Sequence, residues 1–456
     1  MATLSVSFPH LISCHQNQPN LSTFLPYHFS EKIPFLSLYS LSRNCMAVSF
    51  LAGEVSDLCL GKPSLRSLPA TATVAAAVSA LKKSGEVYVT VWGCEHGSPR
   101  SGAVHGGACV CVGKVCMVDV ICFLAKEENA ARPSDALRSP VSELLPKAHG
   151  LVRHLEPHSS DLLMFFCASN CHSLLEAIDY ILEGAQNLVI PIQSYTSTNS
   201  RKKLLKKPTS FGPTLHNGRE FCWLTQEDVV RFLLNGISIF SPIPMLTVES
   251  LDIIDTDIMT VHYNAPASSM LASISRSHME QTSIAVVDED NRLIGEISPF
   301  TLACCDETVA AAIQTLSAGD LMAYIDCGGP PEDLVQLVKT RLQEKNLNGM
   351  LELVEELSLS SLSSASSSCS SDEEFGLGRR GGSGRYSPAR RSEAIVCYPR
   401  SSLMAVMIQA LAHRVNSVWV VEEDYSLIGN VTFTGMLKIF RSFAGCRTEG
   451  DNSFKQ

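Results

Sequence analysis

The chain has no apolar run that approaches the roughly 18 residues needed to span a membrane, and it has no excess of basic residues. It carries 36 lysines and arginines against 46 aspartates and glutamates, a formal net charge of −10. A general nucleic-acid-binding protein presents a basic surface, so this balance argues against that class. We therefore expect neither a membrane nor a nucleic acid as partner.

The signatures of catalysis are lacking as well. The sequence holds no phosphate-binding P-loop, no glycine fingerprint of a dinucleotide-binding fold, and no serine or cysteine on a recognisable nucleophile elbow. The histidines fall in expected loops or singly in expected helices. The sequence therefore predicts that the protein is not an enzyme.

The material for a folded protein is ample. Of the 456 residues, 45% are hydrophobic and 18% are charged, which is ordinary for a globular protein. The 17 cysteines are scattered, odd in number and mostly set in apolar patterns, so we interpret them as reduced thiols of an intracellular protein.

The sequence repeats itself. The stretch SIAVVDEDNRLIG at residues 283–295 returns as SVWVVEEDYSLIG at residues 417–429. Each copy predicts a strand, an acidic turn and a second strand that opens at a glycine. A segment of helical period precedes each copy, at residues 269–279 and 402–413.

Two fainter copies lie upstream and show the same order of helix, strand, strand and helix. The first is predicted at residues 73–83, 87–92, 109–113 and 117–125, and the second at residues 174–182, 187–192, 221–225 and 226–234. A unit this small cannot bury its own apolar face. We therefore expect the units to pack against one another, with any ligand site at the seams between them.

The repeated unit resembles a known family. A glycine that opens the second strand, a Ser or Thr three residues later and an Asp three residues after that are typical of the cystathionine-β-synthase (CBS) domain. The likeness is closest in the segments Val55–Pro63, Gly295–Pro299 and Ser392–Val396. The chain is similar to plant CBSX-type proteins with four CBS repeats. This resemblance implies an α+β fold of four βαββα units paired into two Bateman modules, and a regulatory role.

Composition and resemblance together predict a division of the chain. The expected parts are an extension at 1–45, repeat 1 at 46–128, repeat 2 at 140–236, repeat 3 at 242–310, a helical connector at 311–357, a Ser/Gly/Arg-rich linker at 358–392 and repeat 4 at 393–444. The linker has few apolar side chains to offset the entropy of ordering, so we expect it to be disordered. The connector helices, at 330–341 and 348–357, are expected to bridge repeats 3 and 4.

Residues 1–45 allow two interpretations. Their single acidic residue and many serines are compatible with a chloroplast transit peptide, whereas Met46 as the start of translation indicates a cytoplasmic protein. On either interpretation we expect little order before residue 46.

The resemblance also implies where a ligand binds. In nucleotide-binding CBS domains the Ser or Thr hydroxyl and the Asp carboxylate contact the ligand, so AMP, ATP or S-adenosylmethionine is the implied class. Repeat 2 keeps both groups as Thr225 and Asp228, and repeat 1 keeps Asp119 but has Cys116 in place of the hydroxyl. Helix capping by the same Thr-x-x-Asp pattern is the alternative interpretation of these residues.

Repeats 3 and 4 depart further from the pattern. They keep the hydroxyl as Ser298 and Thr432, but Thr301 and Gly435 stand where the aspartate belongs. Loss of a charge-assisted pair of hydrogen bonds to the ribose costs about 2 to 3 kcal/mol. An adenosine-containing ligand is therefore expected in the first module, if anywhere.

One further group lies outside the family pattern. A hairpin in repeat 1 would bring Cys94 and His96 close to Cys109 and Cys111, and thiolates with an imidazole suit zinc. The spacing is not a recognised zinc signature, and a glycine-rich connection is the alternative. We therefore expect no metal, and these four residues are the weak candidates for a zinc site.

Two functions remain open at this point. One is a regulator that senses an adenosine-containing ligand and modulates a partner protein. The other is a structural adaptor that binds a partner protein through the packed surface without a ligand. They differ because a sensor needs a preserved pocket and an adaptor needs only a surface.

Overall fold

A computed structural model describes residues 46–94, 109–146, 150–155, 173–192, 215–216, 219–326, 329–364 and 393–445. These residues belong to one compact unit, Arg43–Gln456. The expected extension at 1–45 and residues 365–392 of the expected linker lie outside them. Within the described ranges, no helix has the length and apolar character that a bilayer crossing requires.

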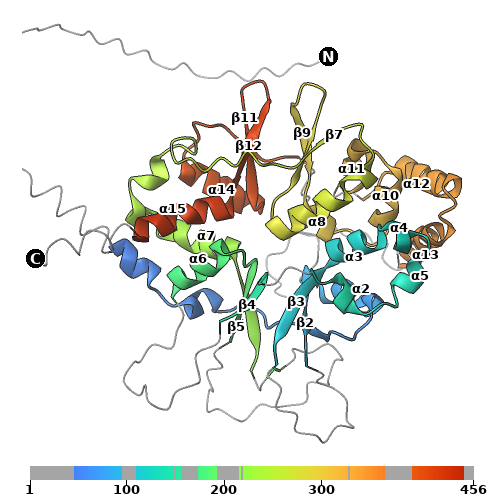
Figure 1. Cartoon of the computed structure of the whole chain (residues 1–456), viewed down its shortest axis with the longest axis horizontal. Helices are drawn as coiled ribbons and strands as arrows, with labels where there is room; N and C mark the ends of the chain where they lie inside the picture. Colours follow the sequence, from blue (N-terminus) through green and yellow to red (C-terminus); the bar gives the residue numbers. More distant parts are fainter. Residues whose placement is uncertain are drawn as a thin grey trace, which may run out of the picture. The chain divides into compact units, whose positions relative to one another are not determined.

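The described residues contain four three-stranded sheets, one in each expected unit (Figure 1). In every sheet the first strand runs parallel to the second, and the second runs antiparallel to the third. The strands are β1 (Ser67–Pro69), β2 (Tyr88–Trp92) and β3 (Cys111–Cys116); β4 (Val152–His154), β5 (Asn187–Pro191) and β6 (Phe221–Thr225); β7 (Thr260–His262), β8 (Ile284–Val287) and β9 (Leu293–Ile297); and β10 (Val396–Cys397), β11 (Ser417–Val421) and β12 (Leu427–Thr432).

Each unit has one helix between its first two strands and another after its third strand, which confirms the predicted βαββα order and the α+β class. These helices are α2 (Val74–Ser84) and α3 (Met117–Leu124), α6 (Leu174–Leu182) and α7 (Gln226–Asn235), α8 (Leu271–Glu280) and α9 (Pro299–Ala303), and α14 (Leu403–His413) and α15 (Phe433–Gly445).

The connecting elements are helices α4 (Glu127–Ala130), α5 (Pro133–Ala136), α10 (Val309–Thr315), α11 (Ala318–Tyr324), α12 (Glu332–Glu344) and α13 (Asn348–Ser364), with 3-10 turns η1 (Val55–Cys59), η2 (Val141–Leu144), η3 (Ile237–Phe240), η4 (Ile243–Met245) and η5 (Ala267–Met270).

Three of the units start their first helix in the same way. Thr73, Ser173 and Ser402 each stand directly before a helix, and each side-chain oxygen accepts a hydrogen bond from the backbone N–H three residues later, at 3.2, 3.2 and 3.3 Å. Such caps satisfy a donor that the helix leaves free. The local sequence therefore sets where these helices begin.

The sheets of consecutive units pack face to face. Trp92 of the first unit lies in a buried cluster with Val189 and Phe221 of the second. In the other pair, the Trp419 indole N–H donates to a Glu296 carboxylate oxygen at 2.8 Å. This arrangement confirms the predicted pairing of units one with two and three with four.

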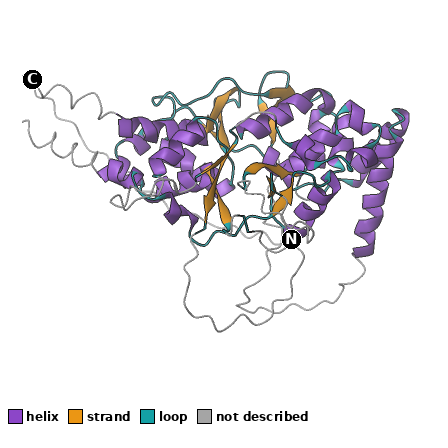
Figure 2. Cartoon of the chain, turned by 60° about the horizontal axis from the view of Figure 1, so that its bottom comes forward, coloured by secondary structure: helices purple, strands orange, loops and turns teal. Residues whose placement is uncertain are grey.

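The helices of the units pair differently, as Figure 1 shows. Helix α3 of the first unit lies against α8 and α9 of the third, and α15 of the fourth lies against α6 and α7 of the second. The two largest apolar cores are built from these crossed pairs. Helices therefore lie on both sides of the strands (Figure 2), and each unit has a different neighbour on its sheet face and on its helical face.

The connector helices α12 and α13 do not bridge the third and fourth units, so that prediction was wrong. Their buried residues Val338, Leu342 and Met350 belong to the core shared by the first and third units, and α13 packs against α5. Helix α13 also continues to Ser364, so residues 358–364 are helical rather than part of a linker.

The segment before β1 belongs to the first unit but also contacts the second. The backbone N–H of Leu174 donates to the Gly53 carbonyl at 2.9 Å, and that of Leu65 donates to the Phe221 carbonyl at 2.8 Å. Because of these bonds, residues 53–65 run along the second unit. This path brings Lys62 to the end of β6.

Gly429 lies where a neighbouring segment runs close to β12. Asp255 and Asn430 exchange two backbone hydrogen bonds of 2.8 and 2.9 Å. A Cβ atom on Gly429 would lie only 2.4 Å from the Asp255 carbonyl oxygen and 2.9 Å from Cγ2 of Ile254. No side chain therefore fits without a shift of the backbone.

We expect Gly429→Ala to lower the free energy of unfolding by about 2 kcal/mol, because overpacking against backbone is not easily relieved. Urea unfolding followed by circular dichroism measures this change. The matched control is Gly113→Ala, where the new Cβ would meet only the flexible Leu145 side chain. Equal losses in the two variants would contradict the explanation.

Candidate functional site

Thr225 and Asp228 lie together where β6 passes into α7. The Thr225 backbone N–H and hydroxyl donate to Asp228 Oδ2 at 2.8 and 2.6 Å, and the Asp228 N–H donates to the Thr225 hydroxyl at 3.2 Å. These reciprocal bonds form a capping box. The pair therefore caps α7, in agreement with the alternative that the sequence left open.

Asp228 also holds a cation. The Lys62 ammonium donates to Asp228 Oδ2 and, at 2.7 Å, to the Trp223 carbonyl oxygen. The Lys62 and Asp228 side chains are 21% and 26% exposed, so water reaches both groups. Cys59 lies near this pair. Its hydrogen bond with the Cys222 side chain and the positive charge of Lys62 lower the pKa of the Cys59 thiol.

Asp119 occupies the equivalent position in the first unit and has a different cation. Its carboxylate accepts a hydrogen bond from the Cys116 backbone N–H at 2.8 Å, and His278 Nε2 of α8 lies 3.4 Å from Oδ1. The same nitrogen lies 3.5 Å from Cys116 Sγ. The third unit therefore places an imidazole against the carboxylate of the first.

Burial and charge act against each other in this cluster. Burial works to lower the pKa of His278, but the neighbouring Cys116 and Asp119 outweigh it and raise that pKa above its ordinary value. Burial works to raise the pKa of Asp119, and His278 together with the Cys116 N–H holds it below its ordinary range. The two groups therefore form an ion pair at neutral pH.

The trio of Cys116, His278 and Asp119 has the residue types of a nucleophilic site but not its access. Cys116 has 0% exposure, and the His278 and Asp119 side chains are only 12% and 9% exposed. A nucleophile must meet its substrate within contact distance. This geometry favours a structural ion pair.

The remaining hydroxyls act as helix caps. Ser298 accepts a hydrogen bond from the Phe300 N–H at 3.3 Å, and Thr432 accepts one from the Gly435 N–H at 3.0 Å. A Cβ on Gly435 would lie 3.5 Å from the Ile253 carbonyl oxygen. The structure therefore places backbone beside the position where the family has its aspartate.

The three cysteines of the weak zinc candidate lie in two different environments. Cys94 and Cys109 come together just after β2 ends and just before β3 begins, and their third neighbour is His216 of the second unit. The Cys111 thiol instead donates to the Gly113 carbonyl at 3.2 Å. His96 lies outside the described residues.

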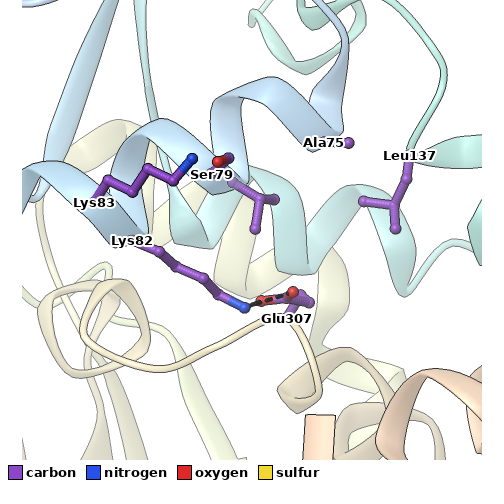
Figure 3. A pocket seen from close by; sticks show the side chains of 7 residues that line it. Ala75, Ser79, Lys82, Lys83, Leu137 and Glu307 are labelled. Carbon is purple, nitrogen blue, oxygen red and sulfur yellow. Dashed lines mark hydrogen bonds and ion pairs between the residues drawn. The ribbon is translucent and has the colours of Figure 1, made fainter. Parts of the chain in front are cut away.

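A hollow of about 350 Å³ lies between α2 and the segment before α10, away from both aspartates (Figure 3). The Lys82 ammonium points across it to the buried Glu307 carboxylate, with its nitrogen 2.7 Å from Oε1 and 2.6 Å from Oε2. This ion pair joins the first unit to the third.

Sequence reasoning missed Lys62 and His278, the two cations at the aspartates. Lys62 lies 166 residues from Asp228, and His278 lies 162 residues from Cys116. Lys62 does stand in the segment Val55–Pro63 that carried the family likeness. No sequence signal, however, paired either cation with its carboxylate.

The chain is similar to one family model and to three proteins of Arabidopsis thaliana. The family model of the CBS domain matches residues 250–303. CBS domain-containing protein CBSX5 of Arabidopsis thaliana is 47% identical over 411 residues, which cover 87% of this chain and 99% of that protein. CBSX6 of the same plant is 26% identical, covering 86% of this chain and 94% of its own length. The SNF1-related protein kinase regulatory subunit gamma-like PV42b is 20% identical, with coverage of 73% and 76%.

The buried ion pair predicts a pH-dependent stability. Because folding raises its pKa, protonated His278 stabilises the folded state fully at a pH below its ordinary pKa of 6.5. This stabilisation is lost as the pH rises through the folded-state pKa of about 10. We expect Asp119→Asn to lower the free energy of unfolding near neutral pH by about 3 kcal/mol, because a buried cation loses its partner.

Urea unfolding between about pH 6.5 and about pH 10 tests the sign. The free energy of unfolding of the unmodified protein should fall across this pH range because His278 loses its proton. The plot of free energy against pH for the variant should lack this fall. Asp135→Asn, at an exposed carboxylate paired with Arg138, is the control. An unchanged slope in Asp119→Asn would show that the pair does not titrate as described.

Proposed function

Because the chain belongs to the family of plant CBS-domain proteins that includes CBSX5, we propose that it is a non-catalytic regulatory protein that acts by binding a partner protein without needing a bound ligand. One observation carries this proposal. Both aspartates in the ligand-binding positions already hold a cation of the chain itself, Lys62 at Asp228 and His278 at Asp119.

A ribose would have to compete for these carboxylates. The lone pairs of Asp228 Oδ2 that a ribose hydroxyl needs face Lys62 and both Thr225 donors. Hydrogen bonds to a charged group are each worth about 1.5 to 3 kcal/mol, so breaking the Lys62 contact offsets much of what the ribose contributes. A ribose competes even less well for the Asp119 carboxylate, because the Asp119–His278 pair is nearly buried.

The second module supports the same conclusion. Its two positions have Thr301 and Gly435 in place of aspartate, and the Ile253 backbone lies beside the latter. None of the four positions therefore offers a carboxylate without a cation. A regulatory role then rests on the surface of the packed units.

The class of partner follows from the more distant relative. PV42b is named as a regulatory subunit-like protein of an SNF1-related protein kinase, and it shares 20% identity over 73% of this chain. We accordingly propose a protein kinase assembly of that class as the partner. The four units form one compact body whose surface is available for such docking.

A second candidate function is kept because one observation favours it. The Lys62–Asp228 pair is about one quarter exposed, whereas the Asp119 side chain is 9% exposed. A ligand phosphate at the second unit could draw Lys62 away and leave Asp228 to the ribose. The second candidate is therefore sensing of AMP, ATP or S-adenosylmethionine at Thr225 and Asp228.

Isothermal titration calorimetry with these three ligands separates the two functions. We expect no saturable heat from the unmodified protein, because the carboxylates are engaged. Lys62→Ala is the matched variant, since it frees the Asp228 carboxylate without altering it, and it should be the first to gain binding. Saturable binding to the unmodified protein that disappears in Asp228→Ala would overturn the first proposal in favour of the second.

The partner proposal has its own test. The purified full chain, immobilised, should retain the recombinant catalytic subunit of an SNF1-related protein kinase, equally well with and without AMP or ATP and equally well as Asp228→Ala. An unrelated protein kinase of similar size is the control. Failure to retain the subunit under any condition would remove this partner class.

A further inference from the structure

Three side chains with metal-binding atoms meet at the seam between the first and second units. Cys94 follows β2, Cys109 precedes β3, and His216 stands in the segment ahead of β6. Their ligand atoms all lie within 4.8 Å of one another. We propose that this cluster binds a zinc ion that fastens the first two units together.

The donor set suits this ion. Cysteine thiolates and histidine imidazoles are among the commonest ligands of Zn²⁺ in proteins, and a structural zinc site takes four ligands, so a fourth donor beside these three completes the tetrahedron. Zn–S bonds of about 2.3 Å and Zn–N bonds of about 2.1 Å put tetrahedral ligand atoms roughly 3.6 Å apart. Cys94 Sγ and His216 Nδ1 are 3.2 Å apart, so an ion between them requires only a small outward shift.

The imidazole is already oriented for this role. His216 Nε2 lies 3.1 Å from the Ser67 hydroxyl oxygen, and the ring stacks on Trp92 with centroids 3.5 Å apart and planes 4° apart. An N–H from Nε2 to Ser67 leaves the lone pair of Nδ1 facing Cys94. Partners of this kind fix the tautomer and direction of a metal-binding histidine.

The burial and the position of the cluster support a structural role. His216 and Cys109 are 3% and 4% exposed, and they come from different units. The apolar contact between these two sheets is a small cluster around Trp92 and Phe221. On binding, the two thiols release their protons to solvent and the ion links the β2–β3 hairpin to the second unit.

Metal content and spectroscopy test the proposal on the full chain, produced without a histidine tag and under reducing conditions. We expect about one zinc per chain by elemental analysis. Replacement by Co²⁺ should give the intense near-ultraviolet bands of thiolate-to-cobalt charge transfer. Co²⁺ should also quench the fluorescence of Trp92, an effect that Trp92→Phe removes.

The matched variants are Cys109→Ser and Cys111→Ser. Both cysteines are 4% exposed and lie two residues apart, but only Cys109 belongs to the cluster. We expect Cys109→Ser to lose at least tenfold in zinc affinity and Cys111→Ser to keep it. His216→Gln, which retains a polar planar group beside Trp92, should also lose zinc.

The outcome that overturns the site does not depend on how the variants fold. Unmodified protein that carries no zinc and shows no charge-transfer band with Co²⁺ would exclude it. A Cys94–Cys109 disulfide in reduced preparations, detected by mass spectrometry, would exclude it equally. Because the site lies apart from Thr225 and Asp228, neither result bears on the proposed partner.

Discussion

Burial of two separate faces on every unit is the constraint on which the rest of the structure depends. A three-stranded sheet with two helices has an apolar sheet face and an apolar helical face, and neither can stay in water without loss of stability. The sheet faces close between consecutive units, around Trp92 in one pair and Trp419 in the other. The helical faces close between alternate units, in the two largest cores. Each unit is therefore held by two neighbours.

The same crossed packing determines the chemistry of the ligand positions. Because α8 of the third unit packs on α3 of the first, His278 reaches Asp119. Because residues 53–65 run along the second unit, Lys62 reaches Asp228. The family's carboxylates have thereby become contacts between parts of the chain. These contacts are the physical ground for our proposal that the protein regulates a partner through its surface. The cluster around His216 is a further contact between two units.

Local features of the fold were predictable. The order of helix, strand, strand and helix follows from the apolar period, and the family resemblance implied the first strand of the βαββα unit. Thr73, Ser173 and Ser402 cap their helices where the sequence placed the helix starts. The pairing of consecutive units was also expected and is confirmed. The packing of α12 and α13 was not, because an amphipathic helix shows which face is apolar but not what covers it. The hairpin did bring Cys94 to Cys109, yet its histidine neighbour came from another unit.

By itself, the sequence determined the repeated unit, its family, the caps of its helices and the positions of Thr225, Asp228 and Asp119, because these depend on residues within a few positions of one another. Only the tertiary structure decided which unit covers which helical face and which cation meets each carboxylate. Lys62 and Asp228 are 166 residues apart, and such contacts depend on how apolar faces close across the whole chain. Spacing along a sequence does not show how these faces close, because the closure exists only in the folded chain.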